Sequence, residues 1–287
     1  MKTSSATDGR IGFRSILLYG VIALVTFLAA SITMLPASVA ARVLQHATNG
    51  QATLAATSGK AWNGRGDLLL KTGAKPIVVR DCSWNVLGDR LWAGELAVRF
   101  TFGGQDLSGQ TTLARSMTTM AVRETRLNIA ANLIAESIDR LRGWGAGGAV
   151  ELAAERLELT GDAINGQADL FWRDATAIGF PTLGDFRLQL KGTGRDPATI
   201  QLTTLRGPLQ VNGRGQATPG KVLRFNGTAR AENGAPDKVN LLVGALGPRG
   251  ADGAYAFELA LPMPRLAGSQ PAGAKAARIN DGGDRHG

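Results

Sequence analysis

Few residues in this chain have the types and spacing that catalysis or metal binding requires. The two histidines, His46 and His286, are far apart in the sequence, and the single cysteine is Cys82. A nucleophilic site needs a nucleophile beside a base, and a zinc site usually shows Cys and His ligands at short, regular spacings. Neither pattern occurs, so the sequence predicts no catalytic residues and no metal ligands.

The remaining acidic and glycine-rich motifs are also typical of structural positions and not of catalytic or phosphate-binding sites. Glu151, Glu155 and Glu158 could suggest paired carboxylates, but they are interleaved with leucines, as on the water-facing side of a strand. The glycine-rich segments 192–194 and 212–215 lack the spacing of a phosphate-binding loop or a dinucleotide-binding motif. We therefore predict a protein that is not an enzyme and that binds no cofactor and no small-molecule substrate.

The composition of the 287-residue chain permits a folded domain with a basic surface. Hydrophobic residues make up 44%, glycine accounts for 38 residues, and the formal net charge is +9. The arginines are scattered singly, which favours a solvated basic surface, with attraction to anionic lipid as the alternative. Nucleic acid is not expected as a partner, because the topology below places the domain outside the cytoplasm. A single cysteine also excludes an intramolecular disulfide.

The N-terminal region has the features of a membrane anchor. Residues 16–35 are apolar and uncharged, and a helix of this length spans about 30 Å, the thickness of a bilayer core. Lys2, Arg10 and Arg14 precede it, opposed only by Asp8, which predicts a cytoplasmic segment 1–15 and an exported chain. A cleaved signal peptide remains the alternative, because residues 38–40 resemble a cleavage site. The length of the apolar run favours a retained helix.

The exported part has the period-2 alternation of antiparallel strands with one buried face. The clearest examples are residues 95–102, 185–191, 199–204, 223–230 and 254–261, with glycine-rich turns between strands. We predict a periplasmic linker at 36–50 and a mainly β domain at 51–262. That domain would be a curved antiparallel sheet, barrel-like or sandwich-like. Two short helices, 132–142 and 239–246, would cover its apolar side, and residues 263–287 would form a disordered tail.

A short sequence pattern recurs inside the β domain. Residues 59–68 are echoed at 161–170 and partly at 207–215, each with an Asn-Gly pair after an apolar residue. Asn-Gly favours the positive φ of turns and bulges. The recurrence suggests equivalent bends in two related halves, 51–143 and 144–262.

Tryptophans supply the candidate interaction residues. Most of the five are embedded in strand-like context, where they could pack in the core or form a binding face. Our preferred patch lies on segment 59–70 and its neighbouring strand, and it consists of Trp62, Asn63, Arg65 and Trp84.

The order of several short motifs resembles a known family. An apolar N-terminal helix is followed by SGKAWNGR at 58–65, Ser83-Trp84, PTLGDFRL at 181–188, GPLQVNG at 207–213 and LLVGALG at 241–247. This arrangement is similar to the type II secretion system protein N family. The resemblance implies a non-enzymatic inner-membrane accessory component of the machine that exports folded proteins from the periplasm across the outer membrane. Its partners would be other secretion components, in the platform, the pseudopilus or the secretin.

A second hypothesis places the chain in a different class of protein. AsmA-like envelope proteins are also anchored by one helix, and they carry a curved sheet whose apolar groove can hold acyl chains. The discriminating feature is length, because about 220 residues of folded β structure are short for a lipid bridge across the periplasm.

Overall fold

The structure is a computed structural model in which thirteen strands and four helices are described. It describes residues 26–27, 31, 33–72, 75–137, 143–195, 197–244, 249–250 and 253–262. The strands are β1 (Ala52–Gly59), β2 (Asn63–Thr72), β3 (Lys75–Val86), β4 (Leu96–Gly103), β5 (Leu107–Arg115), β6 (Thr119–Ala130), β7 (Gly147–Thr160), β8 (Ala163–Ala177), β9 (Phe180–Thr193), β10 (Ala198–Arg206), β11 (Leu209–Ala217), β12 (Val222–Ala231) and β13 (Tyr255–Pro262). The helices are α2 (Ala37–Ala47), α3 (Gly88–Leu91), α4 (Ala131–Ser137) and α5 (Asp237–Gly244). The chain is therefore mainly β, as predicted.

Two predicted segments fall wholly or largely outside this description. Most of the predicted membrane span, residues 16–35, and the whole predicted tail, residues 263–287, lie outside the described residues. Among the helices that are described, none has the length and apolar character needed to cross a membrane.

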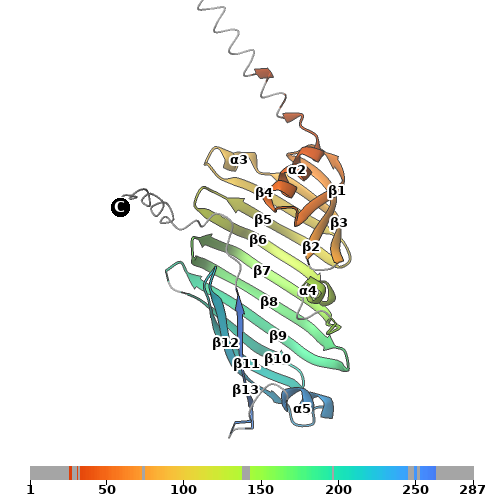
Figure 1. The fold of residues 1–287 in the computed structure, drawn as a ribbon, viewed down its shortest axis with the longest axis vertical. Coiled ribbons are helices and arrows are strands. Elements are labelled where there is room, and N and C mark those ends of the chain that lie inside the picture. The colour runs from red at the N-terminus through yellow and green to blue at the C-terminus, as the bar shows by residue number, and fades with distance from the viewer. Residues whose placement is uncertain are drawn as a thin grey trace, which may run out of the picture. The chain divides into compact units, whose positions relative to one another are not determined.

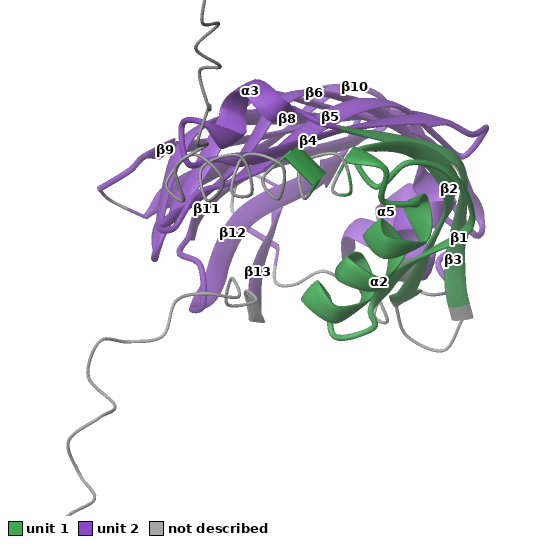
Figure 2. Ribbon diagram, turned by 90° about the horizontal axis from the view of Figure 1, so that it is seen from above, with its two compact units in different colours: residues 1–85 green, residues 86–287 purple. Residues whose placement is uncertain are grey.

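The chain divides into two compact units, residues 1–85 and 86–287 (Figure 2). In unit 1, β1 pairs with β2 and β2 pairs with β3, all antiparallel. Helix α2 packs against β1 and β2, and its Ala37 is buried. The segment predicted as a linker, 36–50, thus contains a helix. Its apolar residues become a stable helix only because β1 supplies a surface on which to bury them.

In unit 2, each strand from β4 to β13 pairs antiparallel with its neighbour in sequence (Figure 1). No pairing among the described residues joins β13 back to β4, and the sheet of this unit is curved but open (Figure 2). This corrects the expected barrel-like or sandwich-like shell. The alternation of side chains predicted one buried face, which a single open layer provides as well as a closed one.

The alternation separates unit 2 into an apolar face and a polar face. A row of five leucines runs across neighbouring strands on the apolar face: Leu127, Leu152, Leu170, Leu188 and Leu202. One residue earlier or later on each strand, the polar face carries Arg126, Ala153, Asp169, Gln189 and Gln201. A shift of one residue in any pairing would move leucines to the polar face, so this pattern fixes the register.

Helix α5 covers part of the apolar face. Val239 and Val243 are almost fully buried, and they belong to one core cluster with Phe186, Leu209 and Ala229. Their spacing of four residues places both valines on one side of the helix. The predicted helix 239–246 is thus confirmed over residues 239–244, with a start two residues earlier, and residues 245–246 lie outside the described residues. The predicted helix 132–142 is confirmed over its first part as α4, and residues 138–142 lie outside the described residues.

The recurring Asn-Gly pairs have two different structural reasons. Gly166 has a φ of 113°, which confirms the predicted positive φ there. At Gly64 and Gly213 the prediction is wrong, because neither has a positive φ and each lies directly beneath an aromatic ring. Trp84 covers Gly64 and Phe225 covers Gly213, so a Cβ at either position would collide with the ring. Glycine is needed at these two positions for close packing.

Candidate functional site

The four predicted patch residues lie together in unit 1, at the turn between β1 and β2 and on β3. Trp84 is buried, with 4% of its surface exposed, and its indole Nε1 donates a hydrogen bond to the Ala61 carbonyl oxygen at 3.0 Å. Its ring rests on Gly64 of β2. Trp84 therefore packs against the turn that contains Trp62 and against β2, which carries Asn63 and Arg65.

The three other patch residues are accessible. The turn is closed by reciprocal backbone hydrogen bonds between Lys60 and Asn63, and Trp62 lies within it, half-buried. Asn63 and Arg65 are exposed on β2. Arg65 pairs with a serine on each side, Ser58 of β1 and Ser83 of β3. The accessible part of the patch is thus an indole, an amide and a guanidinium on a short hairpin.

Cys82 lies two residues from Trp84 on β3 and is fully buried. Burial, together with the negative charge of Asp67, raises the pKa of the Cys82 thiol to about 11. The thiol stays protonated at neutral pH and behaves as a small apolar side chain.

We expect Cys82 in the native protein to react with a maleimide at pH 8 at least about 100-fold more slowly than a free thiol, because so little thiolate is present. A matched exposed thiol can be introduced as Met117→Cys, since Met117 is fully exposed. Labelling followed by mass spectrometry distinguishes the two positions, and unfolding in urea should make Cys82 reactive. Rapid labelling of native Cys82 would contradict its burial.

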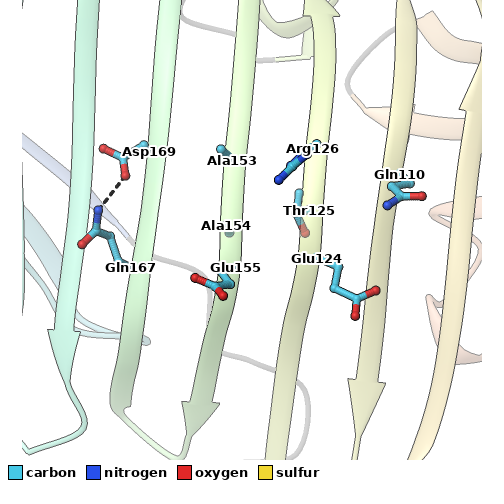
Figure 3. A pocket seen from close by; sticks show the side chains of 9 residues that line it. All are labelled: Gln110, Glu124, Thr125, Arg126, Ala153, Ala154, Glu155, Gln167 and Asp169. Carbon is cyan, nitrogen blue, oxygen red and sulfur yellow. Dashed lines mark hydrogen bonds between the residues drawn. The ribbon is translucent and has the colours of Figure 1, made fainter.

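The polar face of unit 2 has a pocket of about 770 Å³ (Figure 3). Its lining residues come from β5, β6, β7 and β8: Gln110, Glu124, Thr125, Arg126, Ala153, Ala154, Glu155, Gln167 and Asp169. The small side chain of Ala153 stands in register between Arg126 and Asp169, which leaves a depression among longer polar neighbours.

Hydrogen bonds from β8 itself and from β9 already engage the Asp169 carboxylate of this pocket. Asp169 accepts bonds from Gln167 at 2.7 Å, from Gln189 at 2.9 Å and from the Arg187 guanidinium at 2.7 and 2.9 Å. Desolvation alone would raise the pKa of Asp169, but these hydrogen bonds outweigh it and hold the pKa below its usual value. The group is therefore an ionised hydrogen-bond acceptor and not a proton donor at neutral pH.

A second pocket on the same face surrounds a buried carboxylate. Its volume is about 670 Å³, and Asp185, Asp174 and Arg206 are among the residues that line it. Asp185 accepts a hydrogen bond from the backbone N–H of Asp174 at 2.8 Å and from Arg206 Nε at 2.6 Å. Asp174 has a φ of 48° and lies at a register shift between β8 and β9, so Asp185 braces an irregular point of the sheet.

The three glutamates of β7 also face water or arginine. Glu151 and Glu155 are exposed, and Glu158 accepts a hydrogen bond from Arg156 at 2.6 Å. That hydrogen bond is the main reason why the pKa of Glu158 is lowered, and Arg123 at 3.7 Å adds to the effect. The interpretation as the wet side of a strand is confirmed for Glu151 and Glu155, whereas Glu158 is half-buried against arginine.

Sequence reasoning missed these cross-strand networks. Asp169 and Arg187 are 18 residues apart, and Asp185 and Arg206 are 21 apart, so no local motif joins them. Alternation predicts which residues share a face, but only the register decides which of them are neighbours. No group of three or more metal-ligating side chains occurs among the described residues.

These features define a class: a β-rich scaffold in which the carboxylates of Glu158, Asp169 and Asp185 are engaged by arginines of the same sheet. Comparison with known families is more specific. Residues 50–258 match the family described as "Type II secretion system (T2SS), protein N". The chain belongs to this family, and it is thus a component of type II secretion with a location in the cell envelope. The family is structural and is not known for catalysis.

One relative supports this assignment. The type II secretion system protein N of Klebsiella pneumoniae is 27% identical over 221 residues, which cover 75% of this chain and 85% of the relative. No solved structure matches the chain.

Proposed function

We propose that this protein is a non-enzymatic assembly component that holds a β domain beside the inner-membrane platform of the type II secretion machine. The observation that carries the proposal is the family match over residues 50–258, which begins before β1 and ends within β13. The domain would contribute to the export of folded proteins from the periplasm across the outer membrane. Its contacts would be with the platform, the pseudopilus or the secretin.

The proposed topology follows from the sequence. Residues 1–15 would be cytoplasmic, residues 16–35 would form the single span, and the β domain would lie in the periplasm. The charge pattern Lys2, Arg10 and Arg14 before the apolar run supports this orientation.

A secretion assay tests the function directly. In a deletion strain, exported enzymes should accumulate in the periplasm and disappear from the medium, and a plasmid carrying the intact gene should restore their release. Normal secretion in the deletion strain would contradict the proposed role.

The patch at the β1–β2 turn is our proposed contact surface within this function. Replacing Trp62 with alanine should lower partner cross-linking and secretion by at least about fivefold, because tryptophan side chains often dominate the binding energy of an interface. Trp92→Ala is the matched control, since Trp92 is 95% exposed and lies outside the patch. Both variants should be checked by limited proteolysis. If Trp62→Ala alters only stability, while secretion and cross-linking are normal, the patch is not a contact surface.

One observation favours a second candidate, the handling of lipid. The leucine row defined above, Leu127 to Leu202, is only half-buried, so the apolar face offers aliphatic surface beyond the part that α5 covers. Acyl chains are a chemically suitable occupant of such a face. Cells fed with a diazirine-labelled fatty acid would show adducts on β6–β10 if lipid occupies it. Adducts restricted to residues 16–35 would report only the membrane anchor and would contradict this second function.

A further inference from the structure

Strand β13 is the last strand of unit 2 and has one paired side. It pairs with β12 in an unbroken register from Val222 and Pro262 at one end to Ala229 and Tyr255 at the other. On its other side, the described residues provide only an isolated bridge between Arg249 and Tyr255. The outer backbone edge of residues 256–262 therefore has no described β-partner.

This edge has only one of the usual protections against further pairing, the charged side chain of Glu258. Edge strands are normally blunted by bulges, by charged side chains, lysine above all, or by interior prolines. In unit 1, β1 has such a device: its register breaks between Ala55 and Ser58, where Ala56 has a φ of 48°. Strand β13 has no register break, no positive φ and no lysine, and its single proline, Pro262, is its last residue. Its edge is thus regular enough to accept another strand.

We propose that the outer edge of β13 is a strand-addition site for an extended segment of another secretion component. This inference rests on the function proposed above. Backbone hydrogen bonds would supply affinity, and side chains on alternate faces would supply selectivity.

The side chains of β13 indicate the chemistry of that segment. Phe257 packs on Phe225 on the apolar face, and Leu259 on the same face remains 41% exposed. Glu258 projects from the polar face, is exposed, and makes no ion pair with any residue that the structure describes. The added strand should place apolar side chains beside Leu259 and a lysine or arginine beside Glu258.

Charge also argues against a second copy of this chain as the occupant. Two copies of β13 paired antiparallel about a two-fold axis would bring Glu258 opposite itself or within two residues of itself. Like charges at such positions are destabilising. The edge therefore favours a partner with a complementary cation.

Photo-cross-linking in cells that carry the complete secretion system tests this site. The photoreactive residue p-benzoylphenylalanine is placed at Ala260 of the full chain, an exposed position on the same face as Glu258. We expect an adduct with another secretion component, joined through a peptide that contains lysine or arginine. Glu258→Lys should reduce the yield of this adduct at least about fivefold. Replacing the partner's basic residue with glutamate should restore it.

Asn212→Lys is the matched control for folding and added positive charge. Asn212 is exposed on the same face, but it lies on β11 and pairs with Thr228 of β12, two strands inward from β13. It should leave the adduct unchanged, and limited proteolysis should show both variants folded. An adduct yield unaffected by Glu258→Lys, an adduct of two copies of this chain, or one within the chain would each overturn the proposal. A deletion strain with normal secretion would instead overturn the proposed function.

Discussion

Replacing Phe186 with alanine is expected to lower the free energy of unfolding by about 3–5 kcal/mol. Phe186 is 7% exposed and lies in the core cluster that α5 covers. Its ring centroid is 5.9 Å from that of Trp172 on the paired strand β8. Removal of the ring leaves a cavity between the sheet and α5 that rigid strands cannot close, so the lost contacts are not recovered.

The matched control is Phe171→Ala, one residue from Trp172 on the same strand. Phe171 faces the opposite side of the sheet, where Arg173 and Arg187 lie 5.0 and 5.4 Å from its ring centroid. Its loss should cost only about 1–2 kcal/mol, because a half-buried ring loses less area and two weak cation–π contacts. Urea unfolding followed by tryptophan fluorescence measures both. Equal losses in the two variants would contradict the assignment of the two faces.

Replacing Asp185 with asparagine is expected to lower the free energy of unfolding by about 1–3 kcal/mol at pH 7. The Asp185 side chain is 5% exposed, and the substitution removes the charge that Arg206 and the Asp174 N–H stabilise. At the register shift in β8, the Asp174 N–H would lose its charged hydrogen-bond acceptor. A hydrogen-exchange measurement should show faster exchange around residues 173–175 in the variant.

The effect of Asp185 should depend on pH with a definite sign. The hydrogen bond from the Asp174 N–H, followed by the Arg206 contact, holds the pKa of Asp185 below its usual value in the folded state. The unfolded chain therefore takes up the proton first as the pH falls, and the stabilisation is lost from about pH 5 downward. The difference between the native chain and Asp185→Asn should be largest at pH 7 and shrink toward acid. A difference independent of pH would show that the charge of Asp185 contributes nothing.

Local patterns predicted much of this fold correctly. Strand segments such as 185–191 and 223–230 alternate so regularly that their faces could be assigned without a structure. The apolar spacing within residues 239–246 predicted α5. Local patterns did not predict α2, because that helix depends on burial against β1. They also suggested the wrong reason for Gly64, where glycine is needed because the ring of Trp84 packs directly on it.

The candidate site was predictable only in part. The sequence placed Trp62, Asn63 and Arg65 on one short hairpin, and the structure keeps them accessible there. Trp84 could not be distinguished from them, because the burial of an indole depends on which strand lies next to it. The proposed edge of β13 was likewise invisible in the sequence, where residues 254–261 look like any other alternating strand.

The sequence by itself determined the class of structure, because the period of its apolar residues dictates strands with one buried face, and it determined the secretion family through the order of its motifs. Only the tertiary structure decided the register that joins Asp169 to Arg187 and Asp185 to Arg206, the open order of the strands in unit 2, and the strand that lies at its end. The physical reason is that periodicity is a local property of the chain. Pairing, burial and the position of an edge depend on contacts between residues far apart in sequence.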